Sequence, residues 1–160
     1  MNEDRNHQAL AEKGKSASFT IKYLGSQVPL SQMIELEGLT DEEVKGPEML
    51  EKLKKFYAKS SKRITKERTG HYQSILKTKP KSIEIVKIGG RWGSCSSEKA
   101  ITYHYLIATL PMELIDYIVV HELCHLLHMN HDRSFWRKVG SIMPDYKKRQ
   151  EALHKIGGDE

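Results

Sequence analysis

The sequence predicts an α+β fold, in which a small antiparallel sheet packs against one buried helix and further helices precede and follow it. The main observation is the stretch 111–129 (PMELIDYIVVHELCHLLHM), which is apolar nearly all round, as is typical of a buried helix. Apolar residues alternate with other residues around 83–88 and 101–107, which predicts strands. Apolar residues at helical spacing after residues 47 and 132 predict the flanking helices.

The chain of 160 residues is long enough for one domain with its own core, and we divide it into three segments. Residues 1–16 are polar and unpatterned, which predicts a disordered arm. Residues 17–46 are predicted to be a short β-rich segment, because apolar Phe19, Ile21 and Tyr23 alternate with polar residues ahead of Gly25. Residues 47–157 are expected to form the main domain.

The main domain is predicted to begin with helical structure. Pro47 suits a first helical turn, and apolar residues mark one face of the segment that follows: Leu50, Leu53, Tyr57 and Ile64. A second helical piece is expected at 69–77. The stretch 52–68 is strongly basic, which is the usual composition of a solvated helix face. The alternative is that this basic stretch makes a weak contact with a nucleic acid.

Three short strands are expected after Pro80. The first ends at Gly89-Gly90, and the segments RWGSCSS (91–97) and AITYHYLIATL (100–110) complete a small antiparallel sheet. The edge of such a sheet can pair with an extended or unfolded polypeptide by strand addition.

The segment HELCH (121–125) carries the chemistry of the chain. His121 and His125 are four residues apart and therefore share one face of a helix, where both can reach one metal ion. This is the HExxH arrangement of zinc hydrolases, in which Glu122 acts as the general base without being a ligand. Buried imidazoles and a buried carboxylate need partners, and a metal ion supplies them together.

Catalytic zinc sites usually have three protein ligands, so a third is needed. We predict His131, ten residues after His121, because Asn130 tolerates the left-handed conformation that turns a chain back at a helix end. The alternative His128 continues the helix, but its backbone would lie about 10 Å along the axis from that of His121. Glu151, on a later helix, is a further alternative.

Three strings resemble the YgjP-like metallopeptidase family, which is related to SprT-like and WLM zinc proteases: RWGSCSS (91–97), LPMELIDYIVVHELCHLLHMNHDRSFW (110–136) and IMPDYKKR (142–149). The resemblance spans roughly residues 49–156 and implies a zincin-like fold. It also implies that His121, His125 and His131 bind zinc and that Glu122 is the base. The sequence differs from the family pattern in two respects: Thr102 and His104 occur where asparagines would be expected, and the N-terminal β-rich region is short. Both differences bear on the substrate specificity.

The expected activity is therefore hydrolysis of peptide bonds by zinc-activated water. A group that stabilises the oxyanion is expected among Arg91, His104, Tyr105 and Tyr146. Two alternatives are a metal-dependent hydrolase of a phosphoanhydride, such as a nucleotide, and a nucleic-acid-associated module with structural zinc. Phosphate chemistry usually employs oxygen-rich magnesium sites, and structural zinc usually has four ligands, so a site of three imidazoles favours the peptidase.

The two cysteines, Cys95 and Cys124, are predicted to be reduced thiols, which is typical of a cytoplasmic protein. The N-terminus has no apolar core of the signal-peptide kind, and no continuous apolar segment is long enough to span a bilayer. We therefore predict a cytoplasmic protein with no membrane partner.

Overall fold

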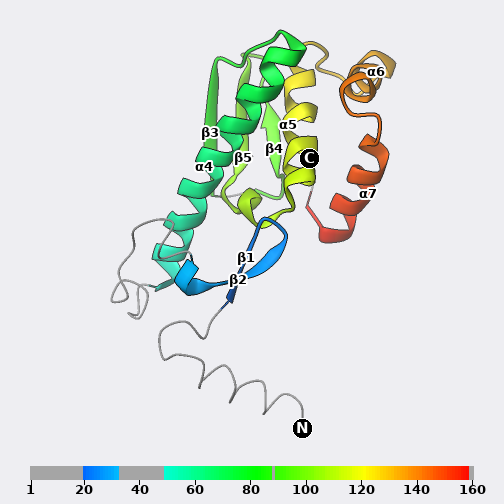
Figure 1. The fold of residues 1–160 in the computed structure, drawn as a ribbon. Coiled ribbons are helices and arrows are strands. Elements are labelled where there is room, and N and C mark those ends of the chain that lie inside the picture. The colour runs from blue at the N-terminus through cyan, green and yellow to red at the C-terminus, as the bar shows by residue number, and fades with distance from the viewer. Residues whose placement is uncertain (1–19, 33–48, 88, 159–160) are drawn as a thin grey trace.

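The computed structural model describes residues 20–32, 49–87 and 89–158, and shows helices beside a small sheet (Figure 1). Its elements in chain order are β1 (Thr20–Tyr23), β2 (Ser26–Pro29), α4 (Met49–Leu76), β3 (Ser82–Val86), β4 (Gly93–Cys95), β5 (Ala100–His104), the 3₁₀ helix η1 (Tyr105–Thr109), α5 (Met112–His125), α6 (Arg133–Ile142) and α7 (Tyr146–Ile156). The predicted mixture of helices and a small sheet is confirmed. The predicted arm at 1–16 lies outside the described residues.

The three-stranded sheet has the order β3-β5-β4, with β5 in the centre. β4 pairs with β5 in the antiparallel sense, whereas β3 pairs with β5 in the parallel sense. The prediction of a purely antiparallel sheet was therefore wrong. The reason is geometric: the chain reverses direction between β3 and β4 and again between β4 and β5, and β4 lies at the opposite edge from β3.

α4 is one continuous helix of 28 residues, where the sequence predicted two pieces. Gly70 lies inside it without interrupting it. The predicted apolar face is only partly buried, since Tyr57 and Ile64 lie in the core whereas Leu50 is 62% exposed. Small polar residues face the core instead: the Ser61 hydroxyl donates to the carbonyl oxygen of Tyr105 at 2.6 Å, and Thr69 is hydrogen-bonded to the Tyr103 hydroxyl at 3.0 Å. These bonds fix α4 against η1 and β5.

β5 ends at His104, earlier than the predicted strand, which extended to Ile107. The His104 Nδ1 accepts a hydrogen bond from the Leu106 amide at 3.2 Å and so caps η1. This side-chain cap competes with strand pairing and starts a helical turn. The chain then enters α5 at Met112.

Residues 20–32, which are the described part of the predicted β-rich segment 17–46, contain a hairpin formed by β1 and β2. Its turn docks on η1, because the Leu24 and Gly25 amides donate to the carbonyl oxygens of Ala108 and Thr109 at 2.8 and 2.9 Å. Gly25 has a φ of +83°, and a Cβ there would lie 2.8 Å from the Pro111 side chain. Only glycine meets both requirements without strain. The hairpin is thus part of the support beneath the first turn of α5.

α5 is the most buried helix, with every residue from Leu114 to His125 in the interior. It packs beside α4, against β4, and under α6 and α7 (Figure 1). The helix α6 begins as predicted, since the Asp132 carboxylate accepts from the Phe135 amide at 3.0 Å. Within the described ranges, no helix is both long and apolar enough to cross a membrane.

Candidate metal centre

The final turns of α5 bring His121, Glu122 and His125 into the interior, with exposed fractions of 2%, 1% and 8%. The two imidazoles lie on the same face of the helix, as their spacing predicted, with ring centroids 4.9 Å apart. Charged forms of these side chains would be costly in such an environment unless they were paired. The burial therefore requires each of these side chains to be neutral or to have a compensating partner.

The chain leaves α5 at His125, about one turn before the predicted end at Met129. The Leu127 and His128 amides both donate to the carbonyl oxygen of Cys124, at 3.0 and 2.8 Å, which tightens the last turn. Asn130 does not adopt the left-handed conformation that we predicted for it. The chain turns back through ordinary backbone conformations, and His131 returns to the two helical imidazoles all the same.

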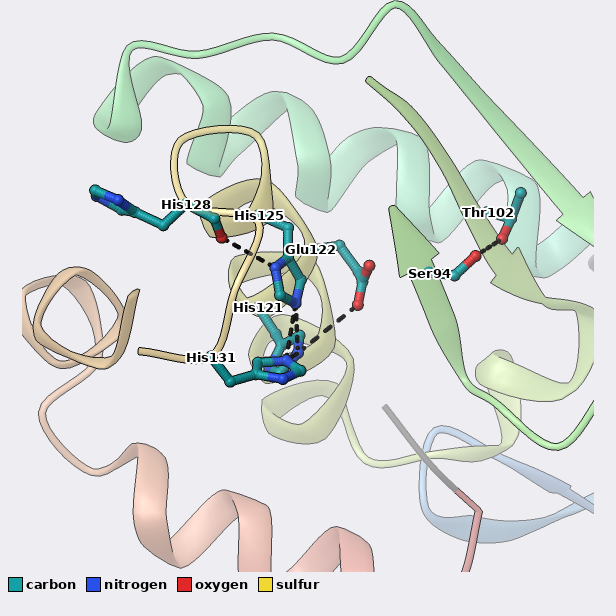
Figure 2. Close-up of polar contacts among 7 residues, drawn as sticks. All are labelled: Ser94, Thr102, His121, Glu122, His125, His128 and His131. Carbon is teal, nitrogen blue, oxygen red and sulfur yellow. Dashed lines mark hydrogen bonds and ion pairs between the residues drawn. The ribbon is translucent and has the colours of Figure 1, made fainter. Parts of the chain in front are cut away.

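Three Nε2 atoms converge at this point, as Figure 2 shows. The Nε2 of His121 lies 3.2 Å from that of His125 and 3.1 Å from that of His131, and the His125 and His131 Nε2 atoms are 2.9 Å apart. Tetrahedral zinc with bonds of about 2.0–2.1 Å to nitrogen requires nitrogens roughly 3.3 Å apart. The spacing therefore fits a single ion between the three rings.

The imidazoles of α5 are in the protonation state that a metal needs. Burial lowers the pKa of His121 to about 3, and the neighbouring His125 and His131 lower it further by charge repulsion. Burial also lowers the pKa of His125. The Nδ1 of His125 lies 3.1 Å from the carbonyl oxygen of His128. A proton on Nδ1 is required for that hydrogen bond, which leaves the lone pair on Nε2 for the metal.

The two alternative ligands lie elsewhere. The His128 imidazole points away from the three converging rings, and only its backbone carbonyl contacts the cluster (Figure 2). Glu151 is exposed on α7. Among the described histidine, cysteine, aspartate and glutamate residues, the group whose geometry suits an ion consists of His121, His125 and His131. Cys95 is outside this group.

Glu122 lies beside the imidazole cluster, with its Oε1 3.9 Å from the His121 Nε2. It lines an open cavity of about 160 Å³, together with His125, His131 and residues of β4. β4 approaches α5 very closely here: a Cβ on Gly93 would lie 3.1 Å from the Cγ of Glu122. The carboxylate is therefore held between the three imidazole rings and the sheet.

Aromatic rings support the cluster from α6. Phe135 stacks on His125 with centroids 4.4 Å apart, and Trp136 stacks on His131 at 5.9 Å. Tyr146 in turn stacks on Trp136 at 5.4 Å. The sequence predicted only a helix after residue 132. The position of Phe135 and Trp136 directly after the Asp132 cap, four and five residues beyond His131, is the signal that could have assigned them to the site.

The four residues suggested for oxyanion stabilisation differ in position. Arg91 lines the same cavity as Glu122. Tyr146 is separated from His131 by the Trp136 ring. His104 caps η1 and packs against Tyr105, with ring centroids 4.9 Å apart. Of these four residues, Arg91 is the one that shares a cavity with Glu122, His125 and His131.

Comparisons with known proteins show which family the chain is similar to. The model of the YgjP-like metallopeptidase domain matches residues 3–156, so the match begins well before residue 49, where the visible resemblance begins. The crystal structure of the metallopeptidase zymogen of Pyrococcus abyssi abylysin has a similar fold, with a TM-score of 0.53 and 24% identity. The similarity covers 57% of this chain and 93% of that one. No curated protein matches. Because the family model covers almost the whole chain, this protein belongs to the YgjP-like metallopeptidase family.

Proposed function

We propose that this metallopeptidase is a zinc enzyme in which His121, His125 and His131 hold the ion and Glu122 is the general base. The observation that carries the proposal is the convergence of three Nε2 atoms within 3.2 Å of one another, beside a carboxylate that is 1% exposed. Three imidazoles are a typical donor set for catalytic zinc, which keeps its fourth position for water or substrate.

Zinc, when bound, supplies Lewis-acid polarisation of the scissile carbonyl and lowers the pKa of water. The chain supplies the proton transfers. Glu122 accepts a proton from the attacking water and then donates it to the leaving amine. Its place in the interior, between His121 and Gly93, excludes bulk water from one side of the carboxylate and fixes its orientation. Arg91, in the same cavity, can stabilise negative charge on the carbonyl oxygen.

The substrate that fits this site is an extended polypeptide. β4 is an edge strand of the sheet, and all three of its residues line the cavity that contains Glu122. A second cavity of about 390 Å³ adjoins it and shares Arg91, Gly93 and Ser94 in its lining. A peptide that adds to the edge of β4 would therefore pass both the imidazoles and this second cavity.

The alternatives have weaker support. The donor set is all nitrogen, whereas enzymes that cleave phosphoanhydrides mostly use oxygen ligands for magnesium. A closed structural zinc site would need a fourth protein ligand, and the described residues provide three. Family membership also favours the peptide bond.

The substitution Glu122→Gln tests the proposal. The variant is expected to retain one zinc per chain and its fold, but to lose about 10²-fold or more of its activity on unfolded protein, because the amide accepts no proton. The matched control is Glu151→Gln, which changes an exposed carboxylate on α7 and is expected to keep both zinc and activity. Full activity in the Glu122 variant would overturn the assignment of the base, and loss of its zinc would make Glu122 a ligand.

A further inference from the structure

A further cavity, which shares no lining residue with the metal centre, lies between α4 and the segment that leads into β3. Figure 1 shows where these two elements lie side by side. Its volume is about 460 Å³, which is in the range of small-molecule sites. Four lysines line it: Lys62 and Lys66 from α4, and Lys79 and Lys81 from the segment before β3. No acidic residue contributes to the lining, so the cavity concentrates positive charge.

The four ammonium groups are available to a ligand. All four lysines are exposed, and none of them forms an ion pair with the described part of the chain. This differs from Arg68 on the same helix, which is paired with Asp116 on α5. Four unpaired cations around one cavity repel one another, and a multivalent anion relieves that repulsion.

The backbone that carries these lysines is fixed. Lys62 and Lys66 are one turn apart on α4, and Gly70 continues the same stripe one turn later. The other two lysines flank Pro80, which is buried. Hydrogen bonds hold that segment at both ends: the Thr78 amide donates to the carbonyl oxygen of Gln73, and the Lys81 amide donates to that of Lys99. The backbone positions that carry the four lysines are therefore set before any ligand binds.

Gly70 leaves room at the cavity wall, because a Cβ at that position would meet nothing within 4 Å. Gln73 and Ser82 add neutral hydrogen-bonding groups to the lining. The cations are all lysines, which bind phosphate groups as point charges, and four of them around one compact cavity suit an anion that carries several charges close together. We infer that this cavity, which we call the four-lysine cavity, binds a compact polyphosphate with adjacent phosphate groups.

The inference is independent of the proposed peptidase mechanism, since it concerns binding at a different set of residues. Inorganic tripolyphosphate is the probe, titrated calorimetrically into the full chain at low and moderate salt. Binding is expected to be saturable, with one site per chain, and to weaken as salt rises, because each neutralised phosphate releases counterions. A single-stranded oligonucleotide and a glutamate-rich peptide of equal charge are titrated in parallel.

Two variants of Gly70 make the decisive comparison. Gly70→Asp places a carboxylate in the four-lysine cavity without removing a lysine, and it is expected to weaken tripolyphosphate binding about tenfold. Gly70→Asn has the same shape without the charge, and it is expected to bind within about twofold of the unaltered protein. Equal binding by the two variants would overturn the inference.

A quadruple variant tests the lysines directly. Changing Lys62, Lys66, Lys79 and Lys81 to Gln is expected to abolish saturable binding. The control changes four other exposed lysines, Lys87, Lys147, Lys148 and Lys155, to Gln and is expected to retain it at the same net charge. Equal loss in both would show that overall charge alone is responsible and would refute the site. Tighter binding of the oligonucleotide or of the acidic peptide than of tripolyphosphate would refute the compact polyphosphate as ligand.

Discussion

Gly93 of β4 and Glu122 of α5 are in such close contact that even a methyl group at Gly93 would lie 3.1 Å from the Cγ of Glu122. The same methyl group would lie 3.1 Å from the Cγ2 of Ile118, one turn earlier on the helix. The sheet therefore determines where the carboxylate stands relative to the three imidazoles. The glycine in RWGSCSS is explained by this contact.

The substitution Gly93→Ala is expected to displace Glu122 or α5 by a few tenths of an ångström. Overpacking of this kind costs about 1–3 kcal/mol of unfolding free energy, and it should lower peptidase activity while zinc content stays unchanged. Thermal unfolding, metal analysis and a peptidase assay measure the three effects. Gly90→Ala is the matched control, because its Cβ would meet nothing within 4 Å. Unaltered activity in the Gly93 variant would show that this contact does not position the carboxylate.

The sequence alone was sufficient to predict those features that depend on residues close together in the chain. The convergence of His121 and His125 follows from helical periodicity, and the Asp132 cap follows from the residue type at a helix start. His131 lies beside the two helical imidazoles, but the chain does not return to them in the way that the sequence predicted. The chain returns after an early end of α5, without a left-handed residue at Asn130.

Relationships between distant segments were not predicted. The parallel pairing of β3 with β5 depends on which edge of the sheet β4 occupies. No local sequence pattern predicts the position of β4 in the sheet. The continuity of α4 across Gly70 depends on packing against η1 and α5, which outweighs the low helix propensity of glycine. The stacking of Trp136 on His131 likewise depends on how α6 folds back over α5.

The assignment of the third ligand leads to a direct prediction of metal content. His131→Ala removes one of three converging Nε2 atoms, so the purified variant is expected to contain much less than one zinc per chain. His128→Ala is expected to retain zinc, because its contribution to the cluster is a backbone carbonyl that the substitution leaves in place. Elemental analysis after dialysis distinguishes them. The opposite pattern would assign the third ligand to His128.

Trp136 is expected to support zinc binding through its ring. It stacks on His131 with ring planes 25° apart, and so limits the rotation of the one ligand that lies outside α5. Trp136→Ala should weaken zinc affinity by about 10-fold, as loss of a group that orients a ligand commonly does. Trp136→Phe, which keeps an aromatic face, should restore most of it. Competition with a chromophoric chelator measures both affinities, and equal affinity in the alanine variant would refute the role of the ring.

The ion pair between Arg68 and Asp116 is expected to be important for stability. Arg68 binds the carboxylate through two nitrogens, at 2.6 and 3.0 Å, and the Asp116 side chain is only 12% exposed. Arg68→Met leaves that carboxylate without its cation and should lower the unfolding free energy by about 3 kcal/mol. Lys54→Met, which breaks an exposed pair with Glu51, should cost less than about 1 kcal/mol. Urea denaturation compares the two, and equal costs would contradict the expected difference.

The reactivity of Cys95 reports on the charge of Glu122. Burial raises the pKa of the Cys95 thiol to about 11, and the Glu122 carboxylate adds to the increase. A rise of about two units above the ordinary value lowers the thiolate fraction at pH 8 roughly a hundredfold, so alkylation of Cys95 should be slow. Cys124 is fully buried, with a pKa raised to about 12, and should contribute little labelling. In Glu122→Gln the repulsion is absent, so Cys95 should react faster and the pH midpoint of its reaction should move down.

The rates of alkylation are measured on chelator-treated protein across pH 7–10, with Cys95→Ser as the background control. Identical profiles for the unaltered protein and the glutamine variant would mean that Glu122 carries no negative charge next to this thiol, which would contradict its proposed role as the proton acceptor.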